Sequence, residues 1–251
     1  MVTEPQELDV TTADVTLRAL TWGPADGPIA LCLHGFPDTA HGWRKVAPAM
    51  ADAGWRVIAP FMRGYAPSSV SSDGSYHVGA LMDDALRVLD AAGPTGRDVL
   101  IGHDWGAIAG AGLAAMPDSP FRKAVIMSVP PSASFRGKVP DAGRLVAQLP
   151  RQLMRSWYIM YFQLPWLPER SASWVVPRYA ELHQHWLSAP TLPTLYLHGT
   201  DDGCATSDYA RWVEPVLPEG SRVEIVDGAG HFMQLDRPDV VAGHILDFVG
   251  R

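Results

Sequence analysis

The chain has 251 residues, of which 47% are hydrophobic and 19% charged, and its formal net charge is −7. This composition is typical of a globular protein and excludes a disordered one. The acidic balance disfavours nucleic acids and anionic membranes as partners, and no apolar run is long enough to span a membrane. The two cysteines, Cys32 and Cys204, form no metal-binding motif, which favours a reduced, cytoplasmic setting. The acidic amino terminus is not typical of a signal peptide.

Strand-like and helix-like segments alternate along most of the chain. The expected strands lie within residues 15–23, 28–35, 56–60, 98–103, 123–130, 191–199 and 221–228. The expected helices lie within residues 41–54, 76–93, 105–117, 208–220 and 237–251. This alternation predicts an α/β fold with a mostly parallel sheet covered by helices on both faces. Sites in such sheets lie in the loops at the carboxyl ends of the strands.

The strand pattern stops between residues 131 and 190, where Trp, Tyr, Met, Pro and Arg are frequent. This segment is too long for one crossover helix, and its aromatic residues exceed what one amphipathic face needs. We predict a helical cap over residues 131–190, set on a core domain formed by residues 1–130 and 191–251. Ordinary crossover helices are the alternative.

The stretch Gly102-His103-Asp104-Trp105-Gly106 has the form G-x-nucleophile-x-G, with Asp where hydrolases usually carry Ser. A strand that turns directly into a helix forces its middle residue into a strained backbone, and side chains at the flanking positions would clash. The amino terminus of the following helix favours a negative charge there. We predict that Asp104 is a nucleophile; a carboxylate that only caps the helix is the alternative.

The stretch His34-Gly35-Phe36-Pro37 follows a predicted inner strand. We expect the backbone N–H groups of Phe36 and Trp105 to form an oxyanion hole. For His34 we expect a packed side chain that supports the loop.

Two motifs late in the chain supply a candidate acid and base. Asp201 and Asp202 follow one predicted strand, and His231 lies in a glycine-rich loop after the last one. The chain order is then nucleophile, acid, histidine. A triad needs a histidine with one ring nitrogen toward the reacting water and the other held by a carboxylate. Taken alone, a histidine in a loop is more typical of a solvated surface residue, but the two companion motifs in this order favour His231 as the base.

Together these motifs resemble the α/β-hydrolase superfamily, specifically its epoxide hydrolase branch, over nearly the whole chain. The resemblance rests on HGFP, on GHDWG, on GxxD ending at Asp202 and on GAGH ending at His231. It favours Asp202 over Asp201 as the acid, because the family's acid falls three residues after the strand-ending glycine, here Gly199. It implies the α/β-hydrolase fold with a helical cap, and no metal or organic cofactor. The cap predicted here is short for the family.

Within the predicted cap, WYIMYFQLP is similar to the family motif in which a tyrosine before FQ donates to the epoxide oxygen. The matching residue is Tyr158. The resemblance implies that Trp157, Tyr161, Phe162 and Tyr179 contact a small hydrophobic epoxide. Either Tyr161 or Tyr179 is the candidate for the family's second cap tyrosine. In the family's D-x-R-G motif, Phe61 stands in place of the acid.

The resemblance implies that the chain opens an epoxide to a vicinal diol through an ester on Asp104, which water activated by His231 and Asp202 hydrolyses. Two other functions stay open. A haloalkane dehalogenase uses the same nucleophile but often carries Asn where this chain has Phe36. A weakly catalytic small-molecule binding protein is the third possibility. The sequence leaves the choice between monomer and homodimer open.

Overall fold

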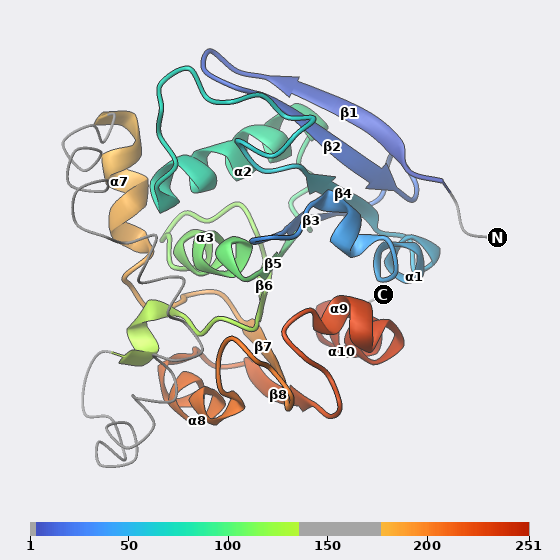
Figure 1. Ribbon diagram of the computed structural model, residues 1–251, viewed down its shortest axis with the longest axis vertical. Coiled ribbons are helices and arrows are strands. Elements are labelled where there is room, and N and C mark those ends of the chain that lie inside the picture. The colour runs from blue at the N-terminus through green and yellow to red at the C-terminus, as the bar shows by residue number, and fades with distance from the viewer. Residues whose placement is uncertain (1–3, 136–176, 251) are drawn as a thin grey trace.

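The computed structural model describes residues 4–135 and 177–250. In this part of the chain, eight strands form one sheet in the order β1-β2-β4-β3-β5-β6-β7-β8 (Figure 1). The strands are β1 (Gln6–Thr11), β2 (Thr16–Trp22), β3 (Ile29–Leu33), β4 (Arg56–Pro60), β5 (Val99–His103), β6 (Lys123–Met127), β7 (Thr194–Gly199) and β8 (Arg222–Val226). Strands β3 to β8 run parallel, and β2 is antiparallel to both β1 and β4. The mostly parallel sheet predicted from the sequence is confirmed.

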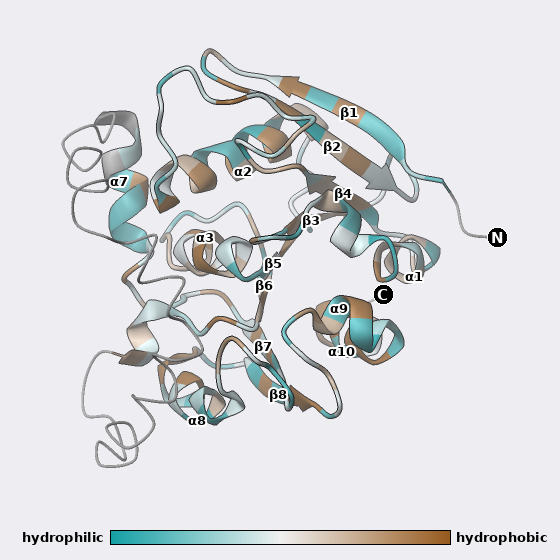
Figure 2. Ribbon diagram, in the orientation of Figure 1, coloured by the Kyte–Doolittle hydropathy of each residue, from teal (hydrophilic) through white to brown (hydrophobic). Residues whose placement is uncertain are grey.

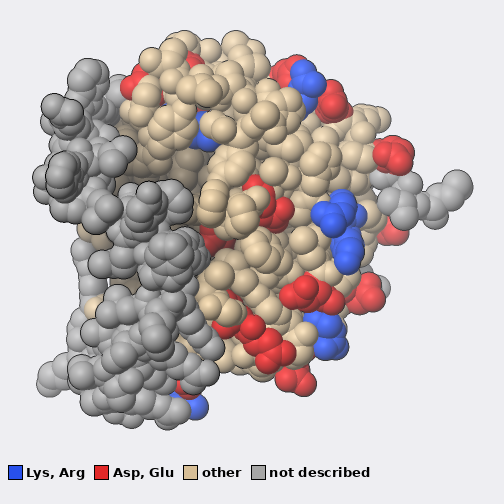
Figure 3. Space-filling view, viewed as in Figure 1, with Lys and Arg blue, Asp and Glu red and all other residues tan. Residues whose placement is uncertain are grey.

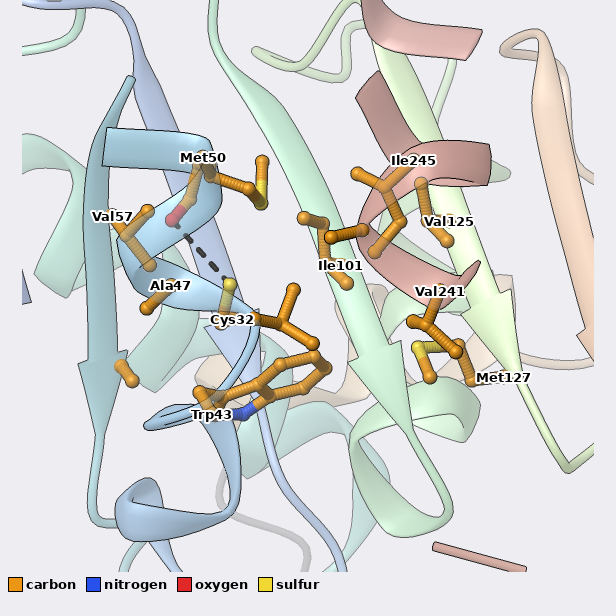
Figure 4. Close-up of a cluster of buried hydrophobic side chains, with 14 of the residues drawn as sticks. Cys32, Trp43, Ala47, Met50, Val57, Ile101, Val125, Met127, Val241 and Ile245 are labelled. Carbon is orange, nitrogen blue, oxygen red and sulfur yellow. Dashed lines mark hydrogen bonds between the residues drawn. The ribbon is translucent and has the colours of Figure 1, made fainter. Parts of the chain in front are cut away.

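Helices cover both faces of the sheet (Figure 1). They are α1 (Ala47–Asp52), α2 (Val78–Ala92), α3 (Trp105–Ala114), α7 (Pro177–His185), α8 (Ala210–Val213), α9 (Met233–Asp236) and α10 (Pro238–Val249). Helices α1 and α10 share one buried cluster with one face of the sheet, while α2 and α3 share another with the opposite face. Figure 4 shows part of the first cluster, in which helix side chains meet strand side chains: Ala47, Met50, Val241 and Ile245 with Cys32, Ile101 and Val125.

The central strands are buried along their whole length and consist mainly of apolar residues, which is why the sequence predicts them well. Every residue of β3, β5 and β7 is buried, and Figure 2 shows the central strands largely in brown. Burial of each large aliphatic side chain stabilises the fold by about 1.5–3 kcal/mol. Strand β1 was not predicted, because only Val10 in it is buried. Its backbone pairs with β2, and Arg18 of β2 bonds Glu7 and Asp9 on it.

The predicted helices are present, although two of them are shorter than expected. Residues 41–54 form a 3-10 turn followed by α1, and residues 208–220 form α8 between two 3-10 turns. Proline accounts for the second break, because Pro215 has no N–H to continue α8.

Most of the predicted cap, residues 131–190, lies outside the described residues. Within the described part of that range, a 3-10 turn spans Ser132–Phe135, and α7 contacts α2 and α3. A Cβ atom at Gly79 of α2 would lie 2.6 Å from the carbonyl oxygen of Tyr179, so α7 approaches the α2 backbone closely. The division into core and cap stays a prediction.

The surface agrees with the acidic composition. On the face shown in Figure 3, basic side chains of the described residues lie in small groups beside acidic ones and form no continuous basic surface. None of the helices in residues 4–135 and 177–250 has both the length and the apolar character needed to cross a membrane.

Candidate active site

Asp104 occupies the sharp turn between β5 and α3. Its φ of 54° lies in a region that side chains other than glycine seldom adopt. The flanking glycines are needed sterically: a Cβ atom at Gly102 would lie 2.2 Å from the carbonyl oxygen of Gly106. Although Asp104 is the N-cap residue of α3, its carboxylate makes no capping hydrogen bond to the helix. The alternative of a carboxylate that only caps the helix is therefore wrong.

The Asp104 carboxylate instead faces two other segments of the chain. Its Oδ1 accepts the backbone N–H of Phe36 at 2.8 Å, and its Oδ2 lies 3.4 Å from Nε2 of His231. A Cβ atom at Gly35 would lie 2.2 Å from Oδ1, so only glycine allows this approach. Burial by itself raises the pKa of Asp104, but the contacts with His231 and the Phe36 N–H outweigh it and lower the pKa. The carboxylate is thus ionised and 17% exposed.

His231 connects Asp104 to Asp202. Its Nδ1 lies 2.9 Å from Oδ2 of Asp202, whose Oδ1 accepts the backbone N–H groups of Cys204 and Ala205 at 2.7 and 2.9 Å. The structure therefore brings together the three side chains that the sequence analysis proposed as nucleophile, acid and base.

The electrostatics of His231 follow from its position between two carboxylates. Burial by itself lowers the pKa of His231, but hydrogen bonds to Asp104 and Asp202 outweigh it and raise the pKa well above 6.5. Burial raises the pKa of Asp202, and the contact with His231 reverses this and lowers it. At neutral pH the resting site holds an imidazolium between two carboxylates.

The backbone of His231 is held by two side chains that the sequence analysis missed. His103 Nε2 and Ser128 Oγ donate to the carbonyl oxygen of His231 at 2.8 and 2.9 Å. Burial lowers the pKa of His103 to about 4, so this ring is neutral with its proton on Nε2. Ser128 follows β6 with a φ of 67°. Its place at the carboxyl end of a strand was the signal in the sequence, but its partner is a backbone atom that no motif reveals.

The remaining core residues named from the sequence line the same region. Phe36 and Trp105 keep 45% and 38% of their surface exposed, beside the nucleophile. Trp105 is the first residue of α3, and donation from its N–H to an oxyanion stays a prediction. His34 is buried and supports the loop as expected: its Nδ1 donates to the carbonyl of Gly35, and its Nε2 accepts the N–H of Met62.

Of the aromatic cap residues that the sequence analysis predicted to contact substrate, the structure describes only Tyr179. Trp157, Tyr158, Tyr161 and Phe162 lie outside the described residues. Tyr179 is fully buried in α7, where its hydroxyl donates to Asp73 at 2.9 Å and accepts from Arg63 at 3.4 Å. These contacts give Tyr179 a place in a buried ion cluster, and its contact with substrate stays a prediction.

Comparisons with known proteins identify the family to which the fold belongs. The alpha/beta hydrolase fold family matches residues 28–156, just over half of the chain. The chain belongs to this family and is a hydrolase.

Individual relatives match over nearly the full length. AB hydrolase superfamily protein YfhM of Bacillus subtilis is 28% identical over 96% of this chain and 96% of its own length. Epoxide hydrolase A of Mycobacterium tuberculosis is 27% identical over 98% and 97%. These alignments extend over 285 and 325 positions, so both relatives carry residues that this chain of 251 lacks.

A solved structure shows the same fold. It is an epoxide hydrolase from metagenomes of hot environments, which superposes with a TM-score of 0.74 at 21% identity and covers 100% of this chain and 99% of its own. At this identity the likeness supports the fold alone.

Proposed function

We propose that this hydrolase opens epoxides to vicinal diols through an ester on Asp104. The observation that carries the proposal is a carboxylate at the nucleophile position, with one oxygen on the Phe36 N–H and the other facing His231. A carboxylate suits displacement at a saturated carbon, because it forms an alkyl ester that the enzyme can later hydrolyse. Several relatives that match this chain are epoxide hydrolases, which supports the choice of substrate.

The first step forms the ester. Oδ1 of Asp104 already accepts the Phe36 N–H, so Oδ2 attacks one carbon of the epoxide. The bond from that carbon to the ring oxygen breaks, and the oxygen takes a proton from Tyr158 of the predicted cap. The products of this step are a β-hydroxyalkyl ester of Asp104 and a tyrosinate at Tyr158.

The second step depends on a change in the pKa of His231. Esterification removes the negative charge of Asp104, which is one of the groups that raise this pKa. His231 therefore loses its proton more readily once the ester has formed, and its Nε2 can accept a proton from water. The nucleophile thus holds its base inactive until the ester exists.

Water then attacks the ester carbonyl carbon and passes a proton to His231. The N–H groups of Phe36 and Trp105 stabilise the tetrahedral oxyanion, and loss of one such donor typically costs about 10²–10³ in rate. The bond between the ester oxygen and the carbonyl carbon breaks. The departing alkoxide takes the proton from His231, and the diol leaves. The proton that remains on the regenerated carboxyl group of Asp104 passes to His231, and Tyr158 regains its proton from solvent.

The surroundings of the carboxylate favour an apolar substrate. Phe36, whose N–H bonds Asp104, and Trp105, which follows Asp104 in the chain, both expose large aromatic side chains. Trp157, Tyr161, Phe162 and Tyr179 are the further candidate contacts. We therefore propose a small hydrophobic epoxide, and better turnover of small polar epoxides would contradict this choice.

A single turnover in heavy-oxygen water, with enzyme in excess, tests the ester. We expect the first diol to be unlabelled and the label to remain in the Asp104 carboxylate, located by mass spectrometry of the peptide. Label in the first diol would show that water attacks the substrate directly and would overturn the proposal.

A trapping experiment tests the separate roles of Asp104 and His231. We expect His231→Gln to accumulate protein whose mass is raised by that of one epoxide, while Asp104→Asn gains no mass. Halide release from haloalkanes, together with no diol from any epoxide tested, would overturn the substrate assignment while leaving the nucleophile in place.

A further inference from the structure

Three side chains at the site carry three different metal-binding atoms. A carboxylate oxygen of Asp202, the thiol sulfur of Cys204 and a ring nitrogen of His231 lie within 4.8 Å of one another. Among the described residues, this is the one group of three or more such side chains placed close enough to share an ion. The proposed reaction uses Asp202 and His231 but has no task for the thiol.

We infer that Asp202, Cys204 and His231 form a binding site for a soft divalent cation such as Zn²⁺ or Cd²⁺, and that the bound cation inhibits hydrolysis. The binding stands on the geometry alone, whereas the inhibition rests on the proposed function.

The spacing of the donor atoms suits such a cation. Zn–S and Zn–N bonds of about 2.3 and 2.0 Å place neighbouring ligand atoms of a tetrahedral site about 3.5 Å apart. Nδ1 of His231 and Oδ2 of Asp202 are 2.9 Å apart, so this pair needs to open only slightly. The three donor atoms lie no more than 4.8 Å apart, so a small rotation of the Cys204 side chain brings its sulfur within reach of a shared cation.

The chemical types of the three donor atoms determine which metal ions the site favours. A thiolate with an imidazole and a carboxylate favours Zn²⁺ and Cd²⁺, whereas Mg²⁺ and Ca²⁺ prefer oxygen ligands only. The turn that carries the site is already ordered, because the N–H groups of Cys204 and Ala205 hold Asp202. Cys204 itself is half-buried, which leaves a side of the cluster open to solvent for entry and for a fourth ligand.

Binding would change the state of His231. The cation takes the place of the proton shared by Nδ1 and Asp202, and the thiol proton of Cys204 is also released. With the metal on Nδ1, the ring keeps its remaining proton on Nε2, the nitrogen that faces Asp104. His231 can then no longer accept a proton from water, so the ester of Asp104 persists.

Titration with Cd²⁺ in the absence of substrate tests the binding. We expect the ultraviolet absorption of a Cd–thiolate bond to rise to one equivalent in the wild-type protein and in Cys32→Ala. Cys32 is the matched control, since it is 1% exposed and its thiol donates to the carbonyl of Ala30. Cys204→Ala and Cys204→Ser should lack the band. No band in the wild type, or an equal band in the folded Cys204 variants, overturns the inference.

Measuring how Zn²⁺ inhibits epoxide hydrolysis tests the second part of the inference. We expect the concentration for half inhibition to rise about 10–100-fold or more in Cys204→Ala, measured against that variant's own activity without metal. EDTA should restore the wild type, and Mg²⁺ should not inhibit. Equal sensitivity of the wild type and Cys204→Ala would overturn the inhibitory role. If no epoxide is hydrolysed at all, the proposed function fails, and the Cd²⁺ titration still decides the binding.

Discussion

Two buried charge clusters differ in the cation at their centre. In the catalytic cluster (Asp104, Asp202 and His231), an imidazole lies between two carboxylates. In the arginine cluster (Arg63, Asp73, Asp84 and Tyr179), a guanidinium lies between two carboxylates, at 2.6 Å from Asp84 and 3.7 Å from Asp73. A guanidinium keeps its proton at any ordinary pH, whereas an imidazole releases one when a neighbouring charge is removed. The first arrangement can move protons and the second can only stabilise structure.

The two clusters also differ in how completely their polar atoms are paired. Arg63 donates to both oxygens of Asp84, at 2.6 and 2.7 Å, and to the carbonyl of Ser75 at 2.7 Å, and its side chain is 1% exposed. Asp104 has one short hydrogen bond, to the Phe36 N–H, and a longer contact of 3.4 Å with His231. A saturated cluster fixes the fold, while the loosely paired carboxylate keeps an oxygen available for reaction.

The largest effect should come from the nucleophile. Asn tolerates a positive φ and keeps the shape of Asp, so Asp104→Asn should fold normally. We expect kcat for epoxide hydrolysis to fall more than about 10⁵-fold, because no ester can form. Product analysis gives the rate, and circular dichroism gives the fold. Residual activity within a factor of about ten of the wild type would show that this carboxylate is not the reacting group.

The acid should rank next. Asp202→Asn should lower kcat about 10⁴-fold, since His231 loses the partner that fixes its tautomer. Asp201→Asn is the matched control, because this exposed neighbour lies outside the catalytic cluster. A larger loss for Asp201→Asn than for Asp202→Asn would reverse the assignment.

In the arginine cluster the loss should appear in stability. Arg63→Met should lower the free energy of unfolding by about 3–5 kcal/mol, because Asp84 is left buried without its partner. Burial already raises the pKa of Asp84 despite the opposing effect of Arg63. Urea unfolding measures the change. The double variant Arg63→Met with Asp84→Leu should recover part of it, and no recovery would contradict the pairing argument.

The raised pKa of His231 should give stability a defined pH dependence. Below about pH 6.5, the folded and unfolded states both carry the proton, so the pairing contributes fully. As the pH rises toward the folded pKa, the unfolded state alone loses it, and the free energy of unfolding falls by about 1.4 kcal/mol per pH unit from this group. Urea unfolding between pH 7 and 9 should show a shallower slope in Asp104→Asn. Equal slopes would indicate that this pKa stays above 9 without Asp104.

The smallest effect is expected at Tyr179, and it distinguishes a structural role in the arginine cluster from a contact with substrate. Tyr179→Phe removes a hydroxyl that bonds Asp73 and Arg63, and we expect a loss of about 1–2 kcal/mol in stability. If the residue belongs only to the arginine cluster, kcat and KM stay unchanged. A raised KM with unchanged stability would instead support the substrate contact predicted from the sequence.

The sequence predicted the sheet well because buried parallel strands are continuous apolar runs. It failed at β1, where only Val10 is buried and backbone pairing with β2 is the main stabilising contact. The order and spacing of Asp104, Asp202 and His231 predicted their meeting, since strand ends in such a sheet lie at one edge. The side chains that hold the catalytic residues in place could not be predicted in this way. Ser128 matters through a bond to the carbonyl of His231, and Tyr179 through its contact with Arg63.

The three side chains of the catalytic cluster are all carried by the ends of sheet strands. Asp104 follows β5, Asp202 follows β7 and His231 follows β8, and these strands belong to one sheet packed on both faces. The separation of nucleophile and base is thus set mainly by the spacing of these strands. We therefore expect mutations in the predicted cap that spare Tyr158 to alter which compounds are accepted while Asp104 and His231 keep their positions, so that new substrates can be reached without rebuilding the catalytic cluster.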